Sequence, residues 1–113
     1  MKFKIGQVVH HQLFDYRGVI FGAHLAFRGS DSWYEQVAKT RPPKDQPWYR
    51  VLVHGSAQTT YVAERNLAIE EHPTAIEHPL VPLLFDELEG GAYTRTSSWE
   101  GDVPLIPNTI ASA

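Results

Sequence analysis

The chain has no cysteine among its 113 residues, which excludes a disulfide framework, a thiolate nucleophile and a zinc site built on cysteine. It has no apolar run near the ~20 residues that a membrane-spanning helix requires. Its first residues, KFKIGQVVH, lack the long apolar stretch of a signal peptide. We therefore expect a soluble protein with a cytoplasmic location.

Motifs that carry catalysis are missing as well. The chain has no Gly-x-Ser-x-Gly elbow, and Gly90-Gly91 is not followed by the Lys-Ser/Thr of a phosphate-binding loop. The adjacent carboxylates Asp86-Glu87 are typical of a solvated face. We expect no enzymatic activity and no catalytic residues.

Six histidines raise the question of a metal site. His72 and His78 lie in twin Glu-His-Pro triplets, but six residues of extended chain separate them by ~18 Å. His10 and His11 point to opposite faces of a strand and do not chelate as a pair. The sequence predicts no metal site and no cofactor.

The charges divide unevenly along a chain of single-domain length. Residues 1–66 hold nine Lys or Arg against five Asp or Glu, whereas residues 67–113 hold one against eight. The halves carry +4 and −7. This asymmetry indicates an acidic tail on a mildly basic domain, two faces for different partners, or simply scattered surface charge.

Short β-type segments dominate the first 70 residues. Two runs, 8–14 and 16–22, read as antiparallel neighbours, and the glycines of the second mark a bulge or a close backbone approach. Residues 49–54 alternate as a strand with one face on the core, 59–63 return as a hairpin, and 67–69 form a last strand. The pattern predicts a mainly β fold, a small partly open barrel of about five strands.

A short helix interrupts the strands. Ser32 to Glu35 matches a capping box, and Arg41-Pro42-Pro43 prevents the helix from continuing. Residues 63–66 fit a single helical turn.

From residue 70 onward the composition becomes proline-rich and acidic. We place a barrel domain at 1–70 and an extension at 71–113, which we expect to pack partly on the barrel. Pro82 is expected to begin a short helix that runs through Leu88 and stops at Gly90-Gly91. The last several residues are expected to be mobile.

In the segment QPWYRVLV we expect Tyr49, Val51 and Val53 to face the core, with Tyr61 across the hairpin. Trp48 lies on the other face and is the candidate for an exposed aromatic lip.

Cations interleaved with aromatic residues suit contact with phosphates and stacking on bases. An aromatic peptide groove is the second interpretation, and packing of the aromatics between helix and barrel is the third. The pI near 6 gives a weaker field than that of most DNA-binding domains. The candidate binding residues are Arg17, Trp33, Lys39, Arg41, Lys44, Trp48, Arg50 and Arg65.

Two motifs carry a family resemblance, QPWYRVLV and YVAERNL, together with KFKIGQVVHHQLFDYRGVIFG. Over residues 3–69 the chain resembles the YccV-like family of hemimethylated-DNA-binding domains, which includes the bacterial heat-shock protein HspQ. Its tail, proline-rich and acidic, departs from the bacterial branch. The matching positions are Gly6, Val8, His10, Tyr16, Gly18, Val19, Trp33, Pro47, Trp48, Tyr49, Val51, Val53, Tyr61, Val62, Ala63, Glu64 and Leu67.

The resemblance implies an SH3-like β-barrel that binds hemimethylated DNA. It also implies an alternative, an adaptor in the heat-shock response that helps the Lon protease degrade selected or denatured client proteins. A self-assembling domain, a homo-oligomer built on unpaired barrel edges, is a third reading. We expect DNA, or Lon and its clients, as partners, and no membrane.

Overall fold

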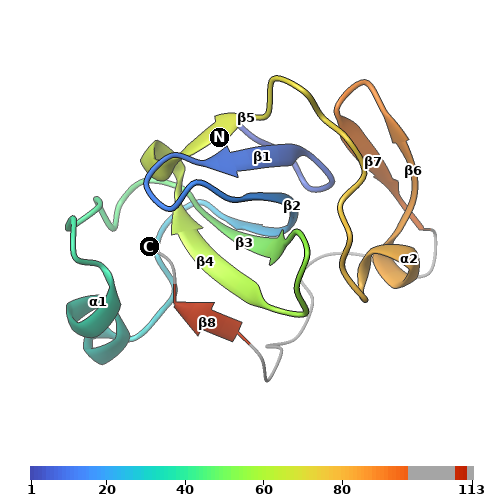
Figure 1. Ribbon diagram of the computed structural model, residues 1–113. Helices are drawn as coiled ribbons and strands as arrows, with labels where there is room; N and C mark the ends of the chain where they lie inside the picture. The colour runs from blue at the N-terminus through green and yellow to red at the C-terminus, as the bar shows by residue number, and fades with distance from the viewer. Residues whose placement is uncertain (97–108, 112–113) are drawn as a thin grey trace.

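The computed structural model describes residues 1–96 and 109–111, and these form a mainly β structure (Figure 1). In chain order the elements are β1 (Val8–His11), β2 (Arg17–His24), α1 (Asp31–Val37), β3 (Trp48–Val53), β4 (Thr59–Ala63), the 3₁₀ turn η1 (Glu64–Asn66), β5 (Leu67–Ile69), α2 (Val81–Leu84), β6 (Phe85–Glu89), β7 (Ala92–Arg95) and β8 (Thr109–Ala111). The expected mobility of the last residues falls largely outside the described residues.

The main sheet runs in the order β5-β1-β2-β3-β4-β8, and β6 and β7 form a separate hairpin. The five strands from β5 to β4 pair antiparallel and correspond to the five that the sequence predicts. The order is linear, so the sheet is not a closed barrel. The predicted fold, mainly β and a small partly open SH3-like barrel, is confirmed. β8 adds a parallel pairing to β4, where the sequence predicts no strand.

Glycines shape β2 as predicted. The register between β2 and β3 shifts between Ile20 and Gly22, which marks a β-bulge. A Cβ atom on Gly18 would clash with the carbonyl oxygen of Leu52, so the two backbones approach closely there. The strand continues to His24, beyond the predicted end at residue 22.

Both faces of β3 are buried. Tyr49 and Val51 belong to one core cluster, as predicted, with Val9, Ile20, Val62 and Leu67 among its members. Leu52, on the other face, is also fully buried and belongs to a second cluster. The expectation that only one face of this strand meets the core was therefore wrong, since a second layer covers the sheet.

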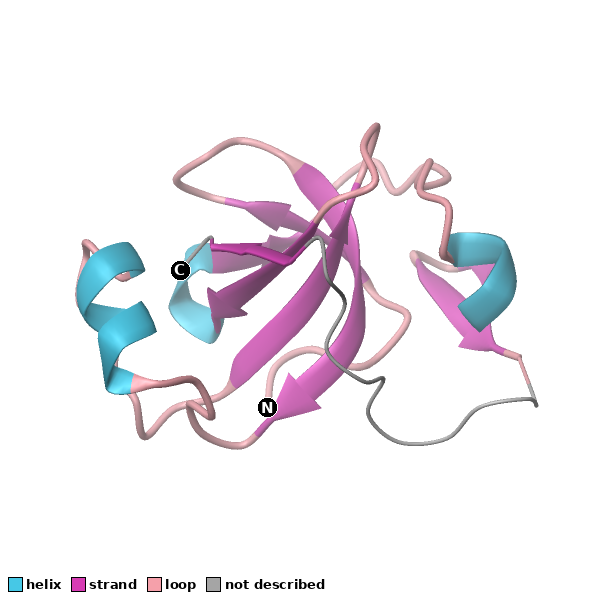
Figure 2. Ribbon diagram, turned by 90° about the horizontal axis from the view of Figure 1, so that it is seen from below, coloured by secondary structure: helices cyan, strands magenta, loops and turns pink. Residues whose placement is uncertain are grey.

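The second layer comes from the C-terminal segment. Ile76, Phe85 and Tyr93 pack on the sheet with Val8 and Phe21. Figures 1 and 2 show α2 and the β6–β7 hairpin on the side of the sheet away from α1. The backbone joins these parts as well, since the N–H of Tyr93 donates to the carbonyl of Gly6 (2.6 Å).

The predicted helix from Pro82 to Leu88 was wrong beyond its first turn. α2 ends at Leu84, and Phe85–Glu89 is a strand paired with β7. Gly90 and Gly91 both have positive φ (59° and 83°), as a two-residue hairpin turn of type I′ requires. The Gly-Gly pair signals a hairpin as well as a helix stop, and strand pairing decides between them.

The helix α1 begins two residues earlier than predicted. Its N-cap is Ser30, whose hydroxyl accepts the backbone N–H of Trp33 (3.0 Å). Ser32 lies inside the helix, so the predicted capping box was wrong in register. The helix ends at Val37, ahead of the prolines as expected, and η1 is the predicted helical turn.

His11 is a buried histidine in the wall of the first core cluster. Its ring stacks between Phe14 and Tyr16, with centroids 4.7 and 5.0 Å away. Its Nδ1 accepts the backbone N–H groups of Leu13 and Phe14 (3.1 Å each). An imidazole that accepts at Nδ1 carries its proton on Nε2 and is neutral. Burial, helped by the nearby His10, lowers the pKa of His11 to about 4.

The burial of the C-terminal hairpin generates the first prediction. Phe85→Ala removes a ring from the second core cluster and should lower the free energy of unfolding by about 3–5 kcal/mol. Leu83→Ala, at a side chain 64% exposed, is the matched control and should change it by less than ~0.5 kcal/mol. Urea unfolding of the full chain measures both. Equal midpoints for Phe85→Ala and the wild type would show that the hairpin is not part of the core.

The second prediction concerns pH. The pKa of His11 is lower in the folded state than in the unfolded chain, so only the unfolded chain takes up a proton as pH falls from about 6.5 to about 4. The free energy of unfolding should decrease across that window, by on the order of 3 kcal/mol from this group, and not above it. His11→Asn keeps an acceptor for the two N–H groups without titrating, and should flatten the curve. His72→Asn, at an exposed histidine, is the control; an equal flattening there would contradict the assignment.

Candidate nucleic-acid interface

Opposite charges lie at opposite ends of the molecule. The exposed carboxylates Asp86, Glu87 and Glu89 lie on β6, and Glu77 lies in the chain before α2. Most of the cations lie around α1 and the loop that follows it. Figures 1 and 2 both place α1 and the hairpin at opposite ends of the sheet. The charge asymmetry of the sequence is therefore also an asymmetry in space.

We call the cationic region around the loop of residues 38–47 the basic end and define it by five exposed cations, Lys2, Lys39, Arg41, Lys44 and Arg65. Four of these are predicted site residues. The loop of residues 38–47 brings them together, because the Arg65 guanidinium donates to the carbonyl of Thr40 in that loop. Lys2 and Arg65 line one cavity with Pro43 of the same loop.

Carboxylates neutralise part of the basic end. Arg41 pairs with Glu35 (2.8 Å) and Lys44 with Asp31 (3.0 Å). With Asp45 and Glu64 nearby, the five cations face four carboxylates, a net charge of +1. Within residues 1–96, the side chains of Lys2, Lys39 and Arg65 form no ion pair with a carboxylate.

Buried aromatic side chains hold the loop in place. The hydroxyl of Tyr34 donates to the carbonyl of Pro42 (2.6 Å). The indole N–H of Trp48 donates to the carbonyl of Pro43 (3.1 Å). Because both donors belong to buried residues, the loop that carries the cations is anchored to the core.

Trp48 is fully buried, so the prediction of an exposed aromatic lip at this position was wrong. Its ring lies 4.8 Å from that of Phe27 and 5.3 Å from that of Tyr61, and Tyr34 packs on it from α1. Trp33 is half-buried in the same cluster, 6.2 Å from Trp48. The helix covers this end of the sheet, which the strand pattern of residues 48–53 does not reveal.

Tyr61 also belongs to this aromatic cluster and not to the core beside Tyr49. Tyr49 pairs with Val62, and Tyr61 pairs with Arg50. The hydroxyl of Tyr61 lies 2.7 Å from Nδ1 of His24. The predicted pairing of Tyr61 with the core face of β3 was therefore wrong, since the hairpin register is one residue different.

Two predicted cations lie away from the basic end. Arg50 is buried, with its guanidinium 4.7 Å from the ring centroid of Phe21. Arg17 donates to the carbonyls of Thr74 (3.0 Å) and Ala75 (3.4 Å). Both arginine side chains therefore contact other parts of the fold and do not belong to the basic end.

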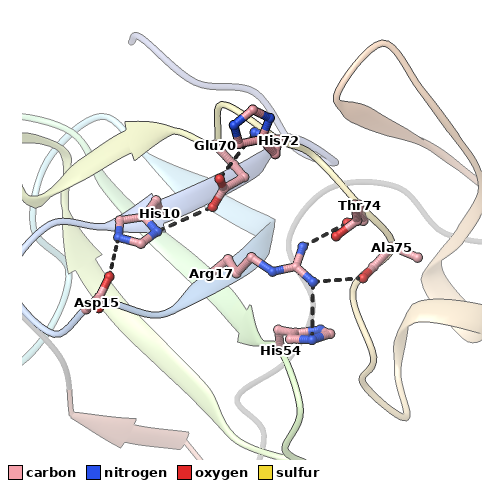
Figure 3. Close-up of polar contacts among 8 residues, drawn as sticks. All are labelled: His10, Asp15, Arg17, His54, Glu70, His72, Thr74 and Ala75. Atoms are coloured by element: carbon pink, nitrogen blue, oxygen red, sulfur yellow. Dashed lines mark hydrogen bonds and ion pairs between the residues drawn. The ribbon is translucent and has the colours of Figure 1, made fainter.

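Figure 3 shows Arg17 directed at His54 and the segment after β5, where it ties that segment to β2. Beside it, His10 lies 2.8 Å from Asp15 and 3.3 Å from Glu70. The described part of the chain has no group of three or more His, Asp or Glu side chains arranged to hold a metal ion. No helix within residues 1–96 and 109–111 has the length and apolar character needed to cross a membrane.

Comparison with protein families gives a match over most of the chain. The model of the family described as hemimethylated DNA-binding protein YccV like matches residues 1–92. The chain belongs to this family. The match confirms the resemblance and extends it past residue 69, through α2 and β6 to the start of β7.

In this YccV-like chain, the sequence motifs missed two residues of the basic end. Lys2 and Glu64 line a cavity of about 200 Å³ with Pro43, Gln46, Ala63 and Arg65. Glu64 belongs to the motif YVAERNL, but the motif alone predicts only that this residue follows a strand. Its contact with Lys2, 62 positions away in the chain, exists only in the folded structure.

Proposed function

We propose that this YccV-like chain is a non-enzymatic DNA-binding module that docks its basic end on the phosphate backbone of hemimethylated duplex DNA. The observation that carries the proposal is the gathering of Lys2, Lys39 and Arg65 at one end, with no ion pair to a carboxylate among the described residues, in a member of a hemimethylated-DNA-binding family. The acidic hairpin at the other end orients the approach, since phosphates repel it.

The weak charge sets the expected strength of this contact. A net charge of +1 at the basic end does not produce the broad field of a strongly basic DNA-binding domain. Three cations without an ion pair to a carboxylate correspond to about three phosphate contacts, and each contributes about −0.9 to the slope of log K against log[salt]. We expect moderate affinity and a slope of about −3.

The aromatic residues favour duplex over single-stranded DNA. Proteins that bind single strands stack bases on exposed aromatic rings. Here Trp48 is buried, and Trp33 is half-buried against Phe27 and Tyr61. These rings serve the aromatic cluster and not a stacking platform.

The third prediction tests this function by fluorescence anisotropy on hemimethylated, fully methylated and unmethylated duplexes at several salt concentrations. The hemimethylated duplex should bind most tightly, with a slope of about −3. Lys39→Ala should weaken binding to all duplexes and reduce the magnitude of the slope by about 1, because one phosphate contact is lost.

Arg95→Ala is the matched control, since it removes the same charge from β7 at the acidic end. It should leave the affinity and the slope nearly unchanged. No binding at low salt would rule out the proposed function. Equal losses in both variants would place the DNA elsewhere than on the basic end.

Exposed apolar side chains favour a second candidate, a protein-interaction adaptor in stress-linked turnover by the Lon protease. Leu13 and Phe14, at the turn after β1, are 51% and 62% exposed. Paired apolar side chains at a turn suit contact with a protein partner better than contact with phosphates.

The fourth prediction follows from this second candidate. If the chain is an adaptor, it should shorten the half-life of a denatured client incubated with Lon and ATP. Leu13→Ser should remove most of that effect, and Leu25→Ser, at a residue 74% exposed elsewhere on the surface, should not. An unchanged client half-life with the wild-type chain would eliminate the adaptor role.

A further inference from the structure

Three kinds of chemical group line the cavity at the basic end. Lys2 and Arg65 supply positive charge, Pro43 and Ala63 supply carbon surface, and Glu64 supplies a carboxylate. Gln46 completes the lining. The volume of about 200 Å³ exceeds the roughly 30 Å³ that one water molecule occupies in the liquid, so the cavity has room for part of a ligand.

The Glu64 carboxylate is held by one of its two oxygens. Its Oε2 accepts the hydroxyl of Tyr49 (2.6 Å) and the backbone N–H of Lys2 (2.9 Å). Oε1 makes no hydrogen bond to any residue in 1–96. A carboxylate oxygen can accept two hydrogen bonds, so Oε1 remains a fixed acceptor on a residue that lines the cavity.

The protonation state supports this role. Burial acts to raise the pKa of Glu64, but the hydrogen bonds from Tyr49 and Lys2 and the charges of the N-terminus and Lys2 lower it by more. The pKa lies below its ordinary value, so the group is ionised at neutral pH. An ionised carboxylate accepts hydrogen bonds and does not donate them.

A methylated base in DNA offers the complementary set of groups. 5-Methylcytosine carries an amino group next to its ring methyl, and one N–H of that group stays free in the major groove of a duplex. N6-methyladenine has a single amino N–H, which its pair with thymine uses. Glu commonly accepts the amino group of a base, and apolar side chains contact a base methyl. The phosphate of the same nucleotide suits the cations Lys2 and Arg65.

We propose that this cavity reads 5-methylcytosine in the duplex: Glu64 Oε1 accepts its free amino N–H, Pro43 contacts its methyl group, and Lys2 and Arg65 contact the adjoining phosphate. This inference rests on the proposed function and names the residue that gives the binding its base preference.

The substitution Glu64→Gln tests it sharply. The donors from Tyr49 and Lys2 hold an oxygen at the position of Oε2, so the amide must place its NH₂ group where Oε1 stood. The variant keeps the shape of the side chain but turns the acceptor into a donor. Because it also removes a negative charge, its affinity for every duplex should rise or stay the same through electrostatics alone.

The experiment measures the ratio of affinities for hemimethylated and unmethylated duplexes, in one arm with N6-methyladenine and in the other with 5-methylcytosine. In the 5-methylcytosine arm, Glu64→Gln should reduce that ratio by about tenfold, because the hydrogen bond to the amino group holds the base methyl against Pro43. Glu35→Gln is the matched control, because it removes the same charge from the same end outside the cavity. It should leave the ratio unchanged.

Pro43→Gly provides a second variant at an exposed position, which removes carbon surface without touching the Tyr49 contact. It should also lower the ratio while the slope against salt stays the same. An unchanged ratio in both cavity variants, or a wild type that prefers only the N6-methyladenine duplex, would overturn this inference and leave the proposed function standing. A wild type that binds no DNA would overturn both.

Discussion

The fold depends on one constraint: β2 and β3 carry buried side chains on both faces, so each face needs a cover. The first face, where Tyr49 and Val51 pack, is covered by Phe3 and by Val9, Val62 and Leu67. The second face, with Phe21 and Leu52, is covered by Ile76, Phe85 and Tyr93. Hydrophobic burial is the main favourable term in folding. Residues 76–93 therefore form a structural layer on the sheet, and the family match runs to residue 92.

The same requirement for burial connects the core to the candidate interface. Trp48 occupies the end of β3, where α1 covers the sheet, and its indole N–H reaches the loop that carries the cations. Tyr34 reaches the neighbouring carbonyl of that loop from the helix. The aromatic residues thus affect binding indirectly, because they fix the backbone of the loop that carries the cations. A preorganised loop loses little conformational entropy when it meets a ligand, and this offsets the low net charge of the basic end.

The basic end also contains a polar contact between residues far apart in the chain. Glu64 follows β4, and the N-terminal segment and the Tyr49 hydroxyl converge on one of its oxygens. Hydrogen bonds to a charged group are stronger than those between neutral groups. The convergence leaves an oriented acceptor among cations, so the interface combines attraction for phosphates with one group able to distinguish bases.

Local patterns in the sequence determined the five barrel strands, the hairpin of residues 49–63, the bulged glycines of β2 and the existence of α1, because alternation and turn residues act over a few positions. The tertiary structure decided the rest. It buried Trp48 under α1, converted the predicted helix at Leu88 into a strand by pairing it with Tyr93, and placed Arg50 inside while Lys39 and Arg65 came together. Burial and strand pairing join residues that are distant in the chain, and no local pattern records which distant residues will meet.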